Sequence, residues 1–180
     1  MMIDGLQLLD VSVHHDERGM FAEAWRRSAD DWVVQTNTSY SRAGVFRGLH
    51  FQYPTWQRKQ VRVLQGRIID VVVDLNLRPG CFGLSEMFEL SAFDGKVLDV
   101  PEGMAHGFYA VEDSVVMYHC GAPYMPDEQR GVSWRVIMDL LSGSEPRFIS
   151  DQDAGWPTLN EVRDQLEKSC DDGRSSMPLL

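Results

Sequence analysis

Short apolar or alternating segments, separated by turn residues, constrain the fold of this chain more than any other feature. They run over Val61 to Leu64, Ile68 to Leu75, Leu84 to Leu90, Val97 to Val100 and Val115 to Tyr118. Turn signals stand between them, as in Gln65-Gly66, Arg78-Pro79-Gly80, Asp94-Gly95 and Pro101-Glu102-Gly103. Many short strands at even spacing are typical of sandwiches and barrels. The region from Leu6 to about Trp134 therefore predicts an all-β domain.

Helical signals are confined to the flanks of this region. Ser28 to Trp32 could form one short helical turn, and Leu159, Val162 and Leu166 share one face of a helix predicted over Thr158 to Lys168. A length of 180 residues is enough for one domain with a substantial core and too short for two ordinary ones. We therefore predict a single domain over residues 1–168, followed by a flexible tail over residues 169–180.

Charge and cysteine content narrow the class of protein. Seventeen lysines and arginines against 27 aspartates and glutamates give a net charge of −10, which disfavours nonspecific binding to nucleic acid or to anionic membranes. No apolar run is long enough to span a bilayer, and the N-terminal segment lacks the pattern of a signal peptide. Cys81, Cys120 and Cys170 are odd in number and far apart, which favours reduced thiols. We expect a cytoplasmic protein with no nucleic-acid or membrane partner.

Two of the five histidines stand in unusual surroundings. His50 follows Arg47 by three positions, and the intervening Gly48 could provide the irregularity that puts both side chains on one face of a strand. His106 lies in a turn that leads into a strand. Taken singly, each is better explained as a partly buried histidine satisfied by a hydrogen bond. Isolated histidines therefore do not identify an enzyme.

Several segments, in order along the chain, resemble the nucleotide-sugar epimerases typified by dTDP-4-dehydrorhamnose 3,5-epimerase. Residues 16–23 read DERGMFAE, close to the family's DERGxFxE, and residues 44–52 read GVFRGLHFQ, close to its GVLRGLHFQ. Further matches within residues 5–160 are Gln35 to Ser39, Gln57 to Val63, Gly66, Asp70 to Asp74, Pro101 to Phe108, Tyr118, Tyr124 and Ile149 to Asp153. An ordered set over most of the chain is far more specific than one short motif.

The resemblance implies a fold and an assembly. The family has a cupin jelly roll, in agreement with the all-β prediction, and usually forms a homodimer in which N-terminal strands pair with the neighbouring subunit. Many cupins bind a metal through an HxH pair, but here His50 is followed by Phe51 and Gln52. The second imidazole is absent, so we expect neither a metal nor another cofactor.

The family inverts a carbon next to a ketone, which requires a base, a group that stabilises the enolate and an acid on the opposite face. His50 matches the base, and Asp153 matches the carboxylate that fixes its tautomer. Lys59 matches the cation beside the keto oxygen. Tyr118 matches the phenol that returns a proton, a role that a nearby cation would favour by lowering its pKa of about 10. Without the resemblance, Lys59 reads as a solvated strand lysine, and Tyr118 as a core residue on the face of Val116.

Eight further positions match residues that bind the substrate. Arg47 matches a residue that holds the diphosphate or hexose, Arg18 one that reaches the diphosphate from the partner subunit, and His106 one that donates a hydrogen bond in the hexose pocket. Those around the thymidine are Phe21, Glu23, Gln35, Asn37 and Tyr124. Read by composition alone, Arg18 is equally a surface turn residue, and Glu23, Gln35 and Asn37 are ordinary strand-edge or turn residues.

The sequence departs from many relatives at two places. After Gly131 to Trp134 they have an acidic pair, a proline and then an Ile-Asp-Trp-Pro segment, whereas residues 135–141 read RVIMDLL here. This leaves the placement of Asp153 open. His119 stands where many relatives have lysine, so the surroundings of Tyr118 could also differ.

The favoured hypothesis is a metal-free epimerase of a dTDP-4-keto-6-deoxyhexose that inverts C3, C5 or both in deoxysugar biosynthesis. One alternative is a C3-only epimerase of an antibiotic-type pathway. A metal-dependent cupin such as a dioxygenase is disfavoured by the missing HxH pair. A noncatalytic sugar-binding cupin is disfavoured because His50, Lys59, Tyr118 and Asp153 are all retained.

Overall fold

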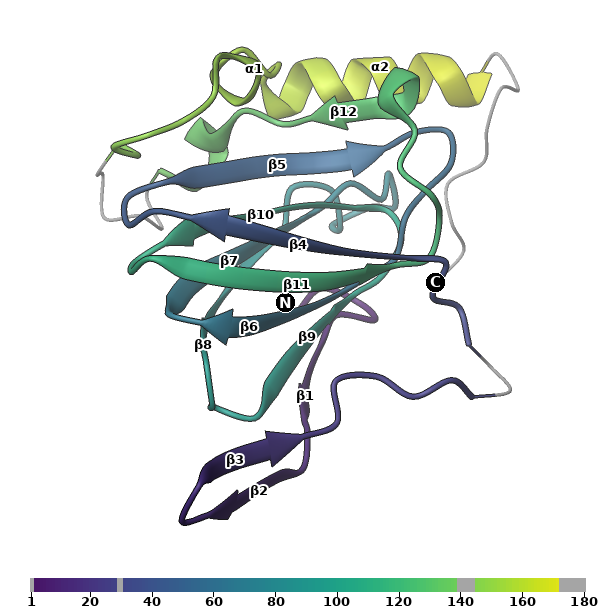
Figure 1. The fold of residues 1–180 in the computed structure, drawn as a ribbon. Coiled ribbons are helices and arrows are strands. Elements are labelled where there is room, and N and C mark those ends of the chain that lie inside the picture. Colours follow the sequence, from purple (N-terminus) through teal and green to yellow (C-terminus); the bar gives the residue numbers. More distant parts are fainter. Residues whose placement is uncertain (1, 29–30, 139–144, 172–180) are drawn as a thin grey trace.

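The computed structural model describes residues 2–28, 31–138 and 145–171, and its body consists of two antiparallel sheets that face each other (Figure 1). One sheet has the order β1 (Gln7–Asp10), β9 (Lys96–Val100), β6 (Lys59–Gln65), β11 (Ser114–Cys120) and β4 (Gln35–Ser41). The other has the order β12 (Gln129–Gly131), β5 (Phe46–Gln52), β10 (Met104–Ala110), β7 (Arg67–Asp74) and β8 (Ser85–Ser91). Neighbouring strands are mostly distant in sequence, because the chain crosses repeatedly between the sheets. This is the predicted all-β jelly roll.

The apolar segments that predicted strands are β6, β7, β8, β9 and β11, each within two residues of its expected bounds. The predicted C-terminal helix is α2 (Leu159–Asp171). Three short elements were too brief for periodicity to indicate: α1 (Asp151–Ala154) and the 3-10 turns η1 (Pro126–Glu128) and η2 (Trp134–Ile137). The turn expected over Ser28 to Trp32 is not helical at the residues described there, and residues 29 and 30 lie outside the described part. Of the tail predicted over residues 169–180, residues 169–171 belong to α2, and residues 172–180 lie outside the described part.

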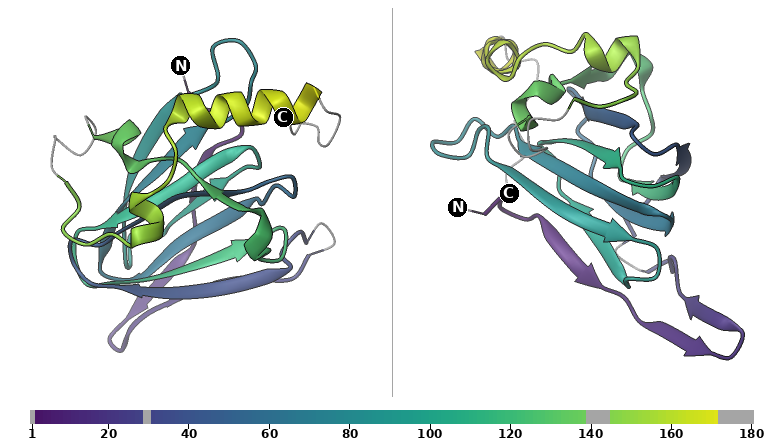
Figure 2. Two further views of the ribbon diagram at one scale, coloured as in Figure 1. Left: turned by 90° about the horizontal axis from the view of Figure 1, so that it is seen from above. Right: turned by 90° about the vertical axis from the view of Figure 1, so that its left-hand side faces the viewer.

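Both faces of strand β7 are buried, which explains why the apolar run over Ile68 to Leu75 is nearly continuous. Its Ile68 and Val72 pack between the two sheets, whereas Val71 and Val73 pack in a second cluster on the other face of their sheet. Helix α2 lies beside this sheet (Figure 2), and its Val162 and Leu166 belong to the second cluster. Each side chain buried in this way contributes about 1.5–3 kcal/mol. The helix is therefore held against the sheet that carries β5.

Strands β2 (Val13–Asp16) and β3 (Gly19–Ala22) form a separate hairpin that projects from the body, most clearly in the right-hand view of Figure 2. Phe21 on this hairpin is 69% exposed, and Met20 is 38% exposed. The hairpin therefore presents apolar side chains that the body of its own chain does not cover.

Two further properties of the described residues bear on the sequence predictions. No helix among them is both long and apolar enough to cross a bilayer. The three cysteines all lie within the described part, and all are free thiols.

Candidate active site

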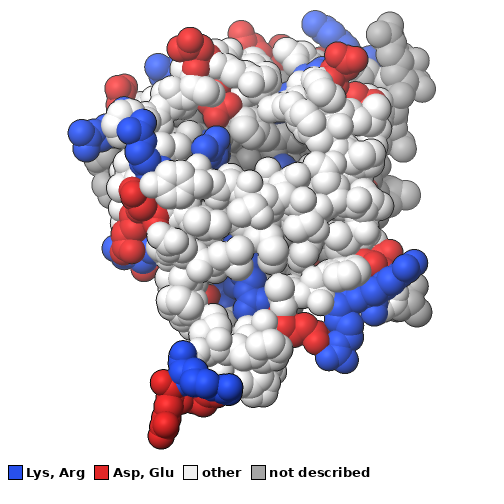
Figure 3. Space-filling view, viewed as in Figure 1, with Lys and Arg blue, Asp and Glu red and all other residues white. Residues whose placement is uncertain are grey.

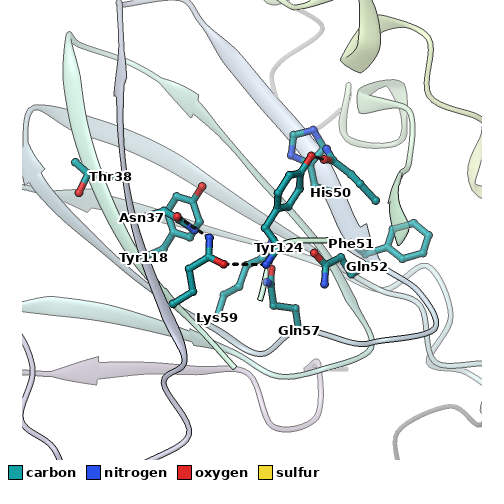
Figure 4. Close-up of a pocket in the computed structure, with 11 residues that line it drawn as sticks. Asn37, Thr38, His50, Phe51, Gln52, Gln57, Lys59, Tyr118 and Tyr124 are labelled. Carbon is teal, nitrogen blue, oxygen red and sulfur yellow. Dashed lines mark hydrogen bonds between the residues drawn. The ribbon is translucent and has the colours of Figure 1, made fainter. Parts of the chain in front are cut away.

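A cavity lies between the two sheets, at the residues predicted to react. Its larger part, drawn in Figure 4, has a volume of about 390 Å³, and a smaller part has about 160 Å³. His50, Lys59 and Tyr118 line both parts, so the two adjoin at these residues. The larger part is completed by Gln35, Asn37, Thr38, Phe51, Gln52, Gln57, Tyr124 and Gln129. The smaller part is completed by Ser39, Arg47, His106, Gly107, Phe108 and Val116.

The reacting groups come from both sheets. Tyr118 on β11 and Lys59 on β6 belong to one sheet, and His50 on β5 belongs to the other. Since all three line the same cavity, the imidazole and the phenol approach it from opposite walls. The face drawn in Figure 3 is covered largely by uncharged side chains; many charged groups lie at its edges and on the hairpin, and a basic patch lies on the body just above the hairpin.

An irregularity in β5 brings Arg47 and His50 to the same cavity. The register between β5 and β10 shifts just after the pair formed by His50 and His106. Gly48 has a φ of 128°, and a Cβ at this position would lie 2.6 Å from the Cα of Gly107. Glycine alone tolerates both this backbone and this close approach. The irregularity predicted at Gly48 is therefore confirmed.

His50 and Asp153 form a hydrogen-bonded dyad, with 2.7 Å between Nε2 and Oδ1. Asp153 is carried by α1, where its N–H donates to the Ser150 hydroxyl over 3.1 Å. The Gly48 N–H donates to Oδ2, and the Trp156 indole N–H donates to Oδ1, each over 3.1 Å. Burial by itself raises the pKa of Asp153, but the hydrogen bonds and the neighbouring imidazole outweigh it and hold the pKa below its ordinary value. An ionised Asp153 fixes the proton on Nε2 of His50 and leaves Nδ1 free to accept one.

The divergent segment before α1 is compatible with this dyad. The Phe148 N–H donates to the Gly44 carbonyl over 3.1 Å, and the Phe46 N–H donates to the Phe148 carbonyl over 2.9 Å. These bonds hold the chain along the start of β5 just before it enters α1. Residues 139–144 lie outside the described part, yet the position of Asp153, which the sequence left open, is beside His50.

Lys59 is a cation that lines both parts of the cavity together with His50 and Tyr118. Burial lowers the pKa of its ammonium, and Cys120 and Asp70 act in the opposite direction. No carboxylate of the described residues forms an ion pair with it. In its protonated form Lys59 is therefore available to an anion that develops in the cavity.

Tyr118 differs from expectation in the direction of its pKa shift. Burial and Cys120 raise the pKa of the phenol, and Arg47 lowers it by less, so the expected net lowering by a cation is wrong. The phenol stays protonated at neutral pH, as an acid must. His119 follows on the opposite face of β11, where its Nδ1 lies 2.9 Å from the Thr36 hydroxyl. The replacement of lysine at that position therefore does not face the phenol.

Three of the predicted thymidine-contacting residues line the larger part of the cavity (Figure 4). The Gln35 amide donates to Asn37 Oδ1 over 2.8 Å and accepts from the Tyr124 N–H over 2.8 Å. The Tyr124 hydroxyl donates to Gln129 Oε1. The hydrogen bonds hold an aromatic ring and amide groups at one wall, where a heterocycle could stack and form hydrogen bonds.

Three others lie on or next to the projecting hairpin and do not line the cavity of their own chain. The Arg18 side chain is 90% exposed and pairs with Asp16. Glu23 pairs with Arg26, and Phe21 stacks on His14 with 6.4 Å between ring centroids. Within a single chain, the structure does not bring these residues to the site.

Arg47 and His106 line the smaller part as predicted. The guanidinium of Arg47 donates to the Ser41 hydroxyl over 2.8 Å and to the Tyr40 carbonyl over 3.0 Å. Sequence reasoning missed several residues of the site: Ser39, Gln52, Gln57, Gln129, Trp156 and Asp70. The two-residue alternation from His50 indicates Gln52, and the charge inside an apolar run indicates Asp70. In the described part of the chain, no three His, Cys, Asp or Glu side chains cluster as metal ligands would.

Comparisons with known proteins find relatives that match most of the chain. A sequence profile described as dTDP-4-dehydrorhamnose 3,5-epimerase matches residues 1–161. The enzyme of that name from Methanothermobacter thermautotrophicus is 36% identical over 170 residues, which cover 88% of this chain and 92% of that protein.

Two solved structures are similar over nearly their whole length. The dTDP-6-deoxy-D-glucose-3,5-epimerase of Legionella pneumophila, in complex with dTDP-4-keto-L-rhamnose, has a TM-score of 0.80 at 30% identity and covers 92% of this chain and 94% of its own. A double mutant of a 3′-monoepimerase from Streptomyces bikiniensis, in complex with dTDP, has a TM-score of 0.81 at 26% identity and covers 93% and 89%.

Proposed function

The chain belongs to the dTDP-4-dehydrorhamnose 3,5-epimerase family, and we propose that it inverts both C3 and C5 of a dTDP-4-keto-6-deoxyhexose without a metal ion. The coarser statement, that it is a deoxysugar epimerase and so an isomerase, follows from the family itself. The mechanism proposed for it rests on the cavity, and the choice of both carbons rests on sequence identity.

One observation carries the proposal: a base and a phenol line the same cavity from opposite sheets. A hexose ring between the sheets would present one face to Nδ1 of His50 and the other to the Tyr118 hydroxyl. His50 removes the proton next to the ketone, and the electron pair of that C–H bond moves into the enolate. Tyr118 then delivers a proton to the carbon from the other side, and the carbon is inverted.

Lys59 stabilises the enolate oxygen in this scheme. It lines the cavity together with the base and the acid, and it has no ion-pair partner among the described residues. A positive charge held in place where negative charge develops contributes on the order of 10²- to 10³-fold in rate. Because Lys59 supplies this charge and Gln52 stands where an HxH pair would have its second imidazole, the proposed reaction needs no metal ion.

The nucleotide would extend from the hexose toward Gln35, Asn37 and Tyr124. We infer that a second copy of the chain completes this end with its hairpin, bringing Arg18 to the diphosphate and Phe21 to the base. Exposure of both side chains and their distance from the cavity of their own chain support a homodimer with exchanged N-terminal strands. A cytoplasmic location, and the absence of nucleic-acid or membrane partners, stay predictions from the sequence.

The test is solvent exchange in D₂O. Purified protein is incubated with a dTDP-4-keto-6-deoxyhexose, and the substrate and product are examined by proton NMR. Deuterium at both C3 and C5 of inverted product supports the proposal. Deuterium at C3 alone supports the second candidate, a C3-only epimerase. Deuterium at neither carbon would refute both.

The second candidate is kept because of the structural match to a 3′-monoepimerase. Sequence identity decides the order of the two: it is 36% to the 3,5-epimerase of Methanothermobacter thermautotrophicus and 26% to the 3′-monoepimerase.

A further inference from the structure

A carboxylate lies buried behind His106, which lines the smaller part of the cavity, the part proposed to hold the hexose. Asp70 on β7 has no solvent-exposed surface. Nε2 of His106, on the adjacent strand β10, lies 2.9 Å from each of its oxygens and is hydrogen bonded to Oδ2. Oδ1 has no hydrogen-bond partner within the described structure. A buried, incompletely satisfied carboxylate is costly to keep, which points to an effect on the groups beside it.

We propose that Asp70 is a positioning residue, which orients His106 with Nδ1 toward the hexose and keeps the Lys59 ammonium charged for the enolate. The inference rests on the proposed epimerase reaction and deepens it. Asp70 itself does not line the cavity and acts only through these two side chains.

The site contains two histidine–carboxylate pairs side by side. His106 is the cross-strand neighbour of His50 in the register between β10 and β5, so both imidazoles belong to one wall. His50 has Asp153 behind it, at 2.7 Å, and His106 has Asp70 behind it. Asp153 belongs to α1 and Asp70 to β7. Asp70 and His106 are 36 positions apart and meet only because β7 and β10 are adjacent strands, so the second pair is not visible in the sequence.

The hydrogen bond with Asp70 determines which ring nitrogen of His106 is unprotonated and can accept a hydrogen bond from the substrate. Burial raises the pKa of Asp70, and His106, Lys59 and the Val71 N–H oppose this shift. In its ionised form the carboxylate only accepts hydrogen bonds, so the contact then places the imidazole proton on Nε2. Nδ1 is then left without a proton on the cavity side. His106 therefore accepts a hydrogen bond from a hexose hydroxyl, which replaces the earlier expectation that it donates one.

Asp70 also supplies the one carboxylate charge that acts on Lys59. The groups facing Lys59 are Tyr118 and Cys120 of β11, His50 and Arg47 of β5, His106 of β10 and Asp70 of β7. Burial favours the neutral amine, and Asp70 opposes this by attracting the ammonium. Lys59 and Tyr118 lie in one sheet and Asp70 in the other, so the attraction acts across the core.

The experiment compares Asp70→Asn with Asp74→Asn in the full chain. Asp74 is a matched control: it lies on the same strand, is equally buried and holds Asn76 through two hydrogen bonds of 2.8 Å, away from the cavity. For each protein, kcat and KM for inversion are measured from pH 6 to 10. The protonated nitrogen of His106 is identified by ¹⁵N NMR without substrate.

For Asp70→Asn we expect kcat to fall at least about tenfold at pH 8. The alkaline limb of its kcat profile should move down by about one pH unit, because Lys59 loses its attracting charge and deprotonates earlier. The control should leave the alkaline limb where it is in the wild type. A profile for Asp70→Asn that overlays the wild type, or that shifts equally in the control, would overturn the proposal.

The NMR measurement keeps the inference testable even if Asp70→Asn does not fold. In the wild type, a neutral His106 with its proton on Nε2 supports the positioning role, and a proton on Nδ1 overturns it. This readout also separates the two proposals. If the wild type exchanges no deuterium, the proposed reaction fails, whereas the NMR result still decides what Asp70 does to His106.

Discussion

Replacing Tyr118 with phenylalanine tests the division of labour between the two walls of the cavity. The substitution removes one hydroxyl and keeps the ring. The hydroxyl forms no hydrogen bond with any described residue, so its loss changes the free energy of unfolding by well under about 1 kcal/mol. The base His50, its partner Asp153 and the cation Lys59 all stay in place.

The expected effect on inversion is large. A positioned general acid contributes roughly 10²- to 10⁴-fold, which corresponds to about 2.7–5.4 kcal/mol in the activation free energy. Proton removal does not need the phenol, because His50 works from the opposite sheet. His50 can return a deuteron to the face from which it took the proton. The variant should therefore incorporate deuterium into substrate of unchanged configuration while inverted product falls steeply.

The assay is proton NMR in D₂O, which resolves exchange without inversion from exchange with inversion. Tyr109→Phe is the matched control. Tyr109 follows Phe108 on β10, and since Phe108 lines the cavity, Tyr109 lies on the opposite face and packs in the cluster beneath α2. The control should leave both signals at the wild-type level.

Inverted product at the wild-type rate in folded Tyr118→Phe would refute the assignment. Loss of exchange and inversion in equal measure would also refute it, because a structural tyrosine behaves in that way. Tyr124, which lines the same cavity, would then be the next candidate for the acid, and its proposed stacking on the base would be withdrawn.

Three other outcomes follow from the same geometry. His50→Ala should lower the rate of deuterium uptake at every carbon by roughly 10²- to 10⁴-fold or more, while dTDP binding measured by calorimetry is retained. An exchange rate within a few-fold of the wild type would show that another group is the base. EDTA should leave turnover intact, and metal analysis of active protein should find no stoichiometric transition metal. Activity that is lost with the chelator and restored by iron, nickel or zinc would contradict the metal-free scheme. Gly48→Ala places a Cβ 2.6 Å from the Cα of Gly107, so melting temperature and kcat should fall together; a variant with wild-type values for both would show that the close approach is not required.

Much of the fold is decided by local patterns, and for a physical reason. Alternation and turn residues act over a few neighbours, so β6, β7, β8, β9 and β11 and the helix α2 can be located from the chain itself. The elements α1 and η2 were not predicted because four residues are too few to show a helical period. The predicted direction of the Tyr118 pKa shift was wrong. Burial raises this pKa by more than Arg47 lowers it, and burial depends on tertiary packing, which local sequence does not reveal.

In the functional site, too, some features could be predicted from the sequence and others depend on the tertiary structure. The resemblance selected His50, Lys59, Tyr118 and Asp153 from the linear sequence, since each stands in a recognisable segment. What joins them is long-range: the dyad closes over 103 positions, through a helical turn that hydrogen bonds hold beside β5. The register shift at Gly48, the partner of His106 and the opposed walls of the cavity likewise depend on which strands are neighbours. Side-chain identity is encoded locally, but distance, burial and the charge that one group imposes on another exist only after the two sheets have packed.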